Sequence, residues 1–144
     1  RFQSVRSGLD RLPSEGYVAI HDGVRPLVTT SVIGRSFSLA REHGSGIAAV
    51  PLKESLRLIE QDSYRTVALD RSKYRLVQTP QTFELGLIKT AYRLKEEDTM
   101  TDDASVAERA GFPVTLFEGD YSNIKITGPE DLSVAEALLS VARK

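Results

Sequence analysis

The sequence predicts an α/β domain in which a mostly parallel sheet is covered by helices on both faces. Two patterns carry this prediction. Short runs of consecutive apolar residues, typical of buried strands, recur along the chain, and segments with apolar residues at helical spacing lie between them. Strands that alternate with helices of this length are joined by right-handed crossovers, which set the strands parallel to one another.

Three apolar runs are predicted strands, and four amphipathic segments are predicted helices. Glycines end two of the helical segments, and an apolar stripe that contains Leu132, Ala135 and Leu139 is expected to be buried in the last one. The predicted strands are residues 17–20, 47–50 and 114–117, and the predicted helices are residues 33–43, 85–92, 105–110 and 127–142.

Residues 55–78 break this alternation and predict a β-hairpin arm on a single domain of residues 1–144. Apolar residues alternate with polar ones on both sides of a polar turn at residues 61–63. A lone hairpin is only marginally stable in water, so its apolar face must pack against something. The body of the same chain and a second subunit both meet that need. The alternating apolar residues are Leu56, Leu58, Val67 and Leu69.

Composition and charge exclude several classes of function. The 144 residues carry a net charge of -1, so no basic surface for nucleic acid or anionic lipid is expected. The lack of cysteine excludes disulfides and thiolate catalysis, and two histidines are too few for a histidine-rich zinc site. No apolar run approaches the ~20 residues of a membrane span and no signal peptide is visible, so we expect a cytoplasmic protein.

Polar residues follow the predicted strands, where open parallel sheets bind their ligands. Asp22 and Arg25 come just after the first strand, and with the flexible Gly23 between them they suit a metal–phosphate pair. From their spacing alone, however, an Asp-Gly turn with a solvated ion pair is the favoured interpretation. Ser55, after the second strand, either donates to a ligand or simply begins the hairpin.

The return from the hairpin supplies two more candidates. Arg71 lies at an expected bend, where it is a solvated surface group unless it enters the active site of a partner subunit. Thr79 is held extended by the proline that follows it, and it is an ordinary loop residue unless it faces the pocket.

The last candidates lie near the two C-terminal helices. Thr101 is the predicted N-cap of a helix and is expected to face any phosphate, because the carboxylates of Asp102 and Asp103 would repel one. These two acids either accept substrate hydroxyls or keep the helix start rigid. Lys125, in a predicted short strand at residues 123–127, is either a solvated lysine or a point charge for a substrate phosphate.

Five motifs occur together in the order and spacing of one family. They are His-Asp-Gly-Val-Arg-Pro at residues 21–26, Asp-Arg at 70–71, Gln-Thr-Pro-Gln-Thr-Phe at 78–83, Thr-Asp-Asp-Ala-Ser at 101–105 and Asn-Ile-Lys-Ile-Thr at 123–127. In these motifs the chain resembles the 2-C-methyl-D-erythritol 4-phosphate cytidylyltransferases of the non-mevalonate isoprenoid pathway. The resemblance runs from about Ser4 to the final helix.

The resemblance implies a three-layer, Rossmann-like nucleotidyltransferase fold whose hairpin arm exchanges with that of its twin in a homodimer. It also implies a reaction in which a phosphate oxygen of methylerythritol 4-phosphate attacks the α-phosphorus of CTP and pyrophosphate leaves, with Mg²⁺ present. Such chemistry requires mainly alignment of the reactants and neutralised charge.

The resemblance further implies a role for each matched residue. Arg71 and Lys125 match the catalytic pair that positions methylerythritol phosphate, with Arg71 reaching in from the other subunit. Asp22 is in addition the candidate for an approach to the metal. The positions that match the substrate-side pocket are Asp22, Arg25, Ser55, Thr79 and Thr101, and those that match contacts to the cytidine nucleotide are Ser4 and Gly23.

Two departures from the family pattern stand out. Gly23-Val24 replaces a commoner Ala-Ala pair, which is a mild change. The larger departure is that these residues contain no glycine-rich loop of the kind that begins family members and carries an arginine and a lysine for the triphosphate. We therefore expect a natural protein that is longer at its N-terminus, and a 144-residue fragment that is unstable and close to inactive.

Two rival functions remain open at this point. Ribitol 5-phosphate cytidylyltransferase shares the fold and most of the motifs with a different acceptor. A non-catalytic nucleotidyltransferase-like dimerisation module fits the absence of the glycine-rich loop.

Overall fold

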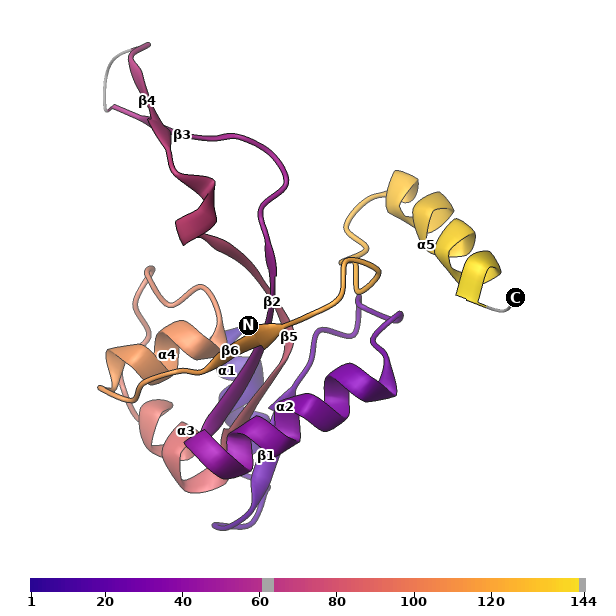
Figure 1. The fold of residues 1–144 in the computed structure, drawn as a ribbon. Helices are drawn as coiled ribbons and strands as arrows, with labels where there is room; N and C mark the ends of the chain where they lie inside the picture. Colours follow the sequence, from indigo (N-terminus) through magenta and orange to yellow (C-terminus); the bar gives the residue numbers. More distant parts are fainter. Residues whose placement is uncertain (61–63, 143–144) are drawn as a thin grey trace.

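The computed structural model describes residues 1–60 and 64–142, so the turn predicted at residues 61–63 lies outside the described residues. The fold is α/β, with a four-stranded sheet and a separate two-stranded hairpin in this part of the chain (Figure 1). In chain order the elements are α1 (Phe2–Leu9), β1 (Tyr17–Ile20), α2 (Thr30–His43), β2 (Ser45–Pro51), β3 (Leu56–Ile59), β4 (Thr66–Leu69), a 3-10 turn (Arg71–Lys73), β5 (Arg75–Glu84), α3 (Leu85–Ala91), α4 (Asp103–Arg109), β6 (Leu116–Glu118) and α5 (Pro129–Ala142).

The main sheet has the strand order β1-β5-β2-β6. Strand β5 pairs antiparallel with β1 and with β2, whereas β2 and β6 are parallel. Three strands therefore run in one direction, as the α/β prediction requires, and β5 runs against them. The reason is the hairpin, which returns the chain beside β2 and so sends β5 back along it. The sequence places residues 75–84 partly in the arm and partly in a loop, whereas they form one ten-residue strand.

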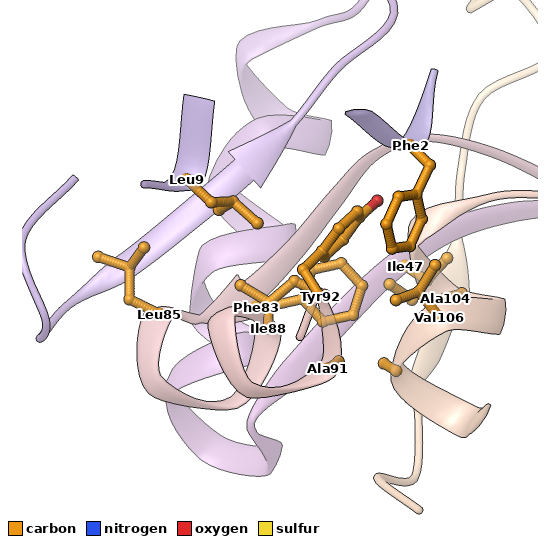
Figure 2. Close-up of a cluster of buried hydrophobic side chains, with 11 residues drawn as sticks. Phe2, Leu9, Ile47, Phe83, Leu85, Ile88, Ala91, Tyr92, Ala104 and Val106 are labelled. Atoms are coloured by element: carbon orange, nitrogen blue, oxygen red, sulfur yellow. The ribbon is translucent and has the colours of Figure 1, made fainter. Parts of the chain in front are cut away.

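Helices cover both faces of the sheet. Helix α2 packs on one face, where the hydroxyl of Thr82 donates to Ser36 Oγ over 2.8 Å. Side chains alternate along a strand, so the next residue, Phe83, points to the opposite face. There it joins Ile47 and apolar residues of α1, α3 and α4 in the core shown in Figure 2. Each large apolar side chain buried in this way contributes about 1.5–3 kcal/mol.

The two ends of the chain differ from expectation. The sequence predicts no element before β1, yet α1 forms there and buries Phe2 and Leu9; its eight residues are too few for a clear helical pattern. Helix α5 stands apart from the sheet (Figure 1). The prediction that its leucines are buried is wrong, because Leu132 and Leu139 are 54% and 41% exposed, whereas Ala135 is buried.

The predicted strand at residues 123–127 is also wrong, since this segment is an irregular loop. Its backbone is nevertheless tied down: the Ile126 N–H donates to the Val24 carbonyl over 2.8 Å. That bond joins the loop to the residues that follow β1, so a single backbone contact replaces the ladder that a strand would have formed.

The hairpin has the register that the period-two pattern predicts. Leu58 lies opposite Val67, and Leu56 lies opposite Leu69, so the four apolar residues share one face. The hairpin extends away from the main sheet in Figure 1. Leu58 and Val67 remain about half exposed, so the body of the same chain does not cover them.

Among residues 1–60 and 64–142, none of the helices is both long and apolar enough to cross a membrane.

The contact between α2 and β2 generates the first prediction. A Cβ added at Gly46 would lie 2.4 Å from the Ser36 carbonyl oxygen, which is backbone and cannot move aside cheaply. We expect Gly46→Ala to destabilise the complete gene product by about 1–3 kcal/mol, as overpacked cores do. The readout is the midpoint of urea unfolding.

Gly8→Ala is the matched control for that substitution. Gly8 lies in α1, where an added Cβ would meet nothing within 4 Å. In a helix this change is expected to be neutral or to stabilise by up to about 1 kcal/mol. A Gly46→Ala variant as stable as the unchanged protein would contradict the close approach of α2 to β2.

Candidate active site

A cavity of about 130 Å³ opens where several elements meet at one end of the sheet. It lies at the carboxyl end of β1, the end of a strand at which open α/β sheets bind ligands. The loop after β1, the middle of β5, the start of α4 and the loop before α5 all reach it. Its lining residues are Arg1, Asp22, Arg25, Val77, Gln78, Thr79, Gln81, Thr101, Asp102 and Lys125.

The carboxylate of Asp22 lies at the centre of the charged groups in this cavity. Lys125 Nζ is 3.2 Å from Asp22 Oδ2 and Arg25 Nε is 3.8 Å from the same oxygen. Arg1 Nε is 3.7 Å from Oδ1. Burial alone would raise the pKa of the Asp22 carboxyl, but the hydrogen bond and charge of Lys125, with the charges of Arg1 and Arg25, bring that pKa below its ordinary value. Asp22 is thus an ionised carboxylate at neutral pH.

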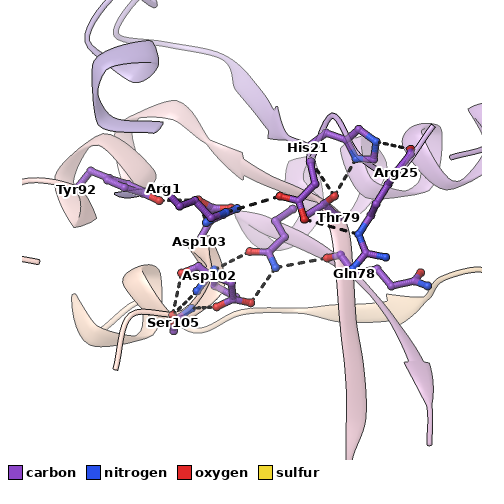
Figure 3. A network of polar contacts seen from close by, with 12 residues as sticks. Arg1, His21, Arg25, Gln78, Thr79, Tyr92, Asp102, Asp103 and Ser105 are labelled. Carbon is purple, nitrogen blue, oxygen red and sulfur yellow. Dashed lines mark hydrogen bonds and ion pairs between the residues drawn. The ribbon is translucent and has the colours of Figure 1, made fainter. Parts of the chain in front are cut away.

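Thr79 fixes the loop that carries Asp22. The Asp22 N–H donates to Thr79 Oγ1 over 3.0 Å, and His21 Nδ1 lies 2.9 Å from the same oxygen. His21 Nε2 lies 3.1 Å from the Arg25 carbonyl oxygen. Every group finds a partner when the Thr79 hydroxyl donates to Nδ1 and the imidazole carries its proton on Nε2. A β-strand residue therefore sets the conformation of the whole His-Asp-Gly-Val-Arg loop (Figure 3).

Asn123 ties both Arg25 and the segment that carries Lys125 to strand β5. Its side-chain amide donates to the Thr79 carbonyl over 2.8 Å, and its own carbonyl accepts from Arg25 Nη1 over 2.7 Å. Arg25 Nε is buried and has no hydrogen-bond partner in the described part of the chain. It lies 3.8 Å from Asp22 Oδ2, so the charge of that carboxylate compensates it.

The start of α4 differs from expectation in one residue. The N-cap is Asp102 rather than Thr101: Asp102 accepts from the Ser105 N–H over 2.8 Å, and the Asp102 N–H donates to Ser105 Oγ. This reciprocal capping box requires a polar side chain three residues on, and Thr101 has only Ala104 there. Thr101 is left exposed at the mouth of the cavity, where it was expected to face a phosphate.

Five of the predicted site residues meet in this cavity, and four do not. Ser55 and Arg71 line a separate cavity of about 350 Å³ at the base of the hairpin, where an Arg71 Nη1–H donates to the Lys53 carbonyl. Ser4, on α1, and Gly23 are exposed and do not line the cavity. The five that meet are Asp22, Arg25, Thr79, Thr101 and Lys125.

A larger cavity, of about 520 Å³, lies against β2, β6 and the 3-10 turn and contains none of the predicted site residues.

Arg1 and Gln81 belong to the cavity but were not among the predicted site residues. The sequence pattern places Gln81 in a loop, because it does not predict that residues 75–84 form a strand. The sequence does contain an indication that Asp103 needs a partner such as Arg1. Asp103 lies on the same apolar helix face as Val106 and Ala107 and is fully buried with them. An acid at such a position requires a buried cationic or hydrogen-bonding partner.

The fit of the cavity to a divalent cation depends on Asp22. Within residues 1–60 and 64–142, no group of three or more His, Cys, Asp or Glu is placed to bind a metal ion. Mg²⁺ is commonly held by one or two carboxylates, with substrate phosphates and water completing the shell. Asp22 suits that role, since it is ionised and borders the cavity.

Comparison with known proteins agrees with this geometry. The family described as 2-C-methyl-D-erythritol 4-phosphate cytidylyltransferase matches residues 1–141. The relative of that name from Bacteroides thetaiotaomicron is 48% identical over 139 residues, which are 96% of this chain and 63% of the relative. That from Dehalococcoides mccartyi is 46% identical over 143 residues, or 99% of this chain and 63% of the relative. The chain thus spans less than two thirds of the length of these curated relatives.

Solved structures agree as well. The crystal structure of the Thermus thermophilus enzyme of the same name has a TM-score of 0.82 at 32% identity, covering 96% of this chain and 69% of that one. The 4-diphosphocytidyl-2C-methyl-D-erythritol synthase of Anaerococcus prevotii has a TM-score of 0.87 at 34% identity, covering 97% and 66%. The chain therefore belongs to the 2-C-methyl-D-erythritol 4-phosphate cytidylyltransferase family.

Proposed function

We propose that the protein containing this chain transfers a cytidylyl group from CTP to 2-C-methyl-D-erythritol 4-phosphate, giving CDP-methylerythritol and pyrophosphate. The observation that carries the proposal is the cavity in which Lys125, Arg25 and Arg1 surround Asp22. Basic groups suit the phosphate of the acceptor, and the hydroxyl of Thr101 suits one of its oxygen atoms. The names of the relatives support the same substrates.

In this reaction an oxygen of the acceptor phosphate forms a bond to the α-phosphorus of CTP, while the bond from that phosphorus to the bridging oxygen breaks. Pyrophosphate leaves with the electron pair of the broken bond. Lys125 would orient the acceptor phosphate and offset its charge, and Arg25, held by the Asn123 carbonyl, would bind a second oxygen. Little else is needed from the protein, since phosphoryl-type transfers depend on alignment and charge neutralisation.

Asp22 is the residue we propose to approach Mg²⁺, and the ion, when bound, would neutralise charge on the triphosphate. Ser4 and Gly23 are proposed contacts of the cytidine nucleotide; both are exposed and so open to a ligand. The cytoplasmic location expected from the sequence stays a prediction.

Arg71 is proposed to act from the other subunit of a homodimer. Within one chain Arg71 and Ser55 line a different cavity from Lys125, so an exchanged arm is one way to unite these residues in one site. The half-exposed Leu58 and Val67 support such an exchange, because a partner surface would bury them.

The substrates can be tested directly on the complete gene product with CTP and Mg²⁺, by following pyrophosphate release. We expect methylerythritol 4-phosphate to be turned over in preference to ribitol 5-phosphate. Lys125→Gln should lower kcat/KM by about a hundred-fold, the scale of losing one charge-stabilising group at a reacting centre. Arg109→Gln, which breaks only an exposed ion pair with Glu97, is the control.

Preference for ribitol 5-phosphate would reject the proposed acceptor. Turnover of neither acceptor would support the non-catalytic module instead.

The exchange of arms can be tested with mixed dimers. Arg71→Ala and Lys125→Gln subunits should each be nearly inactive alone. If Arg71 acts across the interface, refolding the two together restores one intact site in each heterodimer, or about a quarter of the unchanged activity after random assembly. No recovery in a mixture shown by native mass spectrometry to contain heterodimers would place Arg71 and Lys125 in the same subunit's site.

A further inference from the structure

The carboxylate of Asp103 is fully buried beside the cavity and has two partners. Tyr92 donates its hydroxyl to Asp103 Oδ1 over 2.5 Å. Arg1 donates from Nη1 to Oδ1 over 3.1 Å and from Nη2 to Oδ2. The three side chains come from the start of α1, the end of α3 and the first turn of α4 (Figure 3). The ring centroids of Phe2 and Tyr92 are 4.6 Å apart (Figure 2).

Arg1 links this buried group to the cavity. Two of its nitrogens bind Asp103, and its third, Nε, lies 3.7 Å from Asp22 Oδ1. The guanidinium is planar and rigid, so fixing one edge of the fork on Asp103 also fixes the direction of the other. Its side chain is 36% exposed and lines the cavity.

Helix packing alone does not explain an acid at this position. Asp103 shares its helix face with Val106 and Ala107, and an apolar residue there would avoid the cost of burying a charge. Tyr92 is committed to Asp103 as a donor, because burial and the neighbouring carboxylate raise the pKa of its hydroxyl far above the ordinary value. Tyr92 therefore remains a hydrogen-bond donor to Asp103 at neutral pH.

We propose that Asp103 and Tyr92 are positioning residues that hold the Arg1 guanidinium against Asp22. Arg1 then shares the charge of Asp22 with Lys125, whose Nζ is 3.2 Å from the same carboxylate, and so leaves the lysine able to bind the acceptor phosphate. This inference rests on the function proposed above.

Charge counting makes the inference testable. Around the cavity, Arg1, Arg25 and Lys125 face Asp22, Asp102 and the buried Asp103. Asp103→Asn removes a negative charge at nearly constant volume. If only net charge matters, this variant binds an anionic acceptor more tightly. If Asp103 positions Arg1, it binds the acceptor more weakly in spite of the added positive charge.

The experiment compares Asp103→Asn, Arg1→Gln, the double variant and Tyr92→Phe in the complete gene product, below the unfolding temperature of each. We expect Asp103→Asn and Arg1→Gln to lower kcat/KM for the acceptor roughly ten-fold each, the scale of a lost charge-assisted hydrogen bond. Tyr92→Phe should have a smaller effect in the same direction. The double variant should be no worse than Arg1→Gln, because the two residues act as one unit.

Arg109→Gln is again the control, since Arg109 lies on the same helix as Asp103 and its ion pair with Glu97 is exposed. A gain in acceptor affinity for Asp103→Asn would overturn the proposal. So would a loss of thermal stability without any change in kcat or KM, which would show a purely structural role.

Calorimetric titration with inorganic phosphate provides a second readout that needs no turnover. We expect Asp103→Asn and Arg1→Gln to bind phosphate several-fold more weakly than the unchanged protein. If the unchanged protein binds phosphate but turns over neither acceptor, the proposed function fails while the positioning role is still decided by this titration. If the unchanged protein binds no phosphate and the variants do not differ in turnover, the positioning role is rejected.

Discussion

Strand β5 lies between β1 and β2, and its buried polar side chains organise everything around the cavity. Gln78, Thr79, Gln81 and Thr82 are all buried in the middle of the sheet, where an unpaired polar group is costly. Each therefore binds a different neighbour. Gln78 donates to the Asp120 carbonyl, just before the loop of Lys125, and Thr79 accepts from the Asp22 N–H in the loop after β1. Gln81 binds Asp102 and the Ala104 N–H at the start of α4. Thr82 binds a serine of α2. Because the buried polar side chains of β5 all require hydrogen-bond partners, this one strand brings together four segments that are distant in the sequence.

The hydrogen bonds of β5 also help to position the charged groups of the cavity. Asp22 and Arg25 sit on a loop whose backbone is tied to Thr79 through the Asp22 N–H and to Ile126 through the Val24 carbonyl, so their side chains start from fixed positions. Partly exposed ion pairs contribute little net stability, because solvent screening and desolvation offset their attraction. Their value here is geometric: when the surrounding dipoles and charges are already in place, a ligand meets them without the cost of ordering them.

The sequence predicts best those features that depend on local pattern. The three apolar strands and the register of the hairpin follow from runs and from period-two alternation, and the structure agrees with both. Strand β5 was missed because polar residues at its centre imitate a loop, and only their tertiary partners make burial acceptable.

The site divides in the same way. Motif spacing brought together Asp22, Arg25, Thr79, Thr101 and Lys125, which do meet. It could not reveal Arg1, because the reason for its placement is a carboxylate 102 residues away. The exposure of Leu132 and Leu139 could not be predicted either. An amphipathic pattern shows that one face of a helix is apolar, but it does not identify the surface that covers this face.

The loop that carries Lys125 is anchored on both sides of that residue. Upstream, the side chain of Asn123 is buried and bound to Thr79, and downstream the Ile126 N–H is bound to Val24. Helix α5 begins only beyond the second anchor, at Pro129. Residues 127 and 128 are bound to α5 instead, since their N–H groups donate to the Asp131 carboxylate in its first turn. The position of the lysine is therefore set by β5 and by the loop after β1, and not by α5.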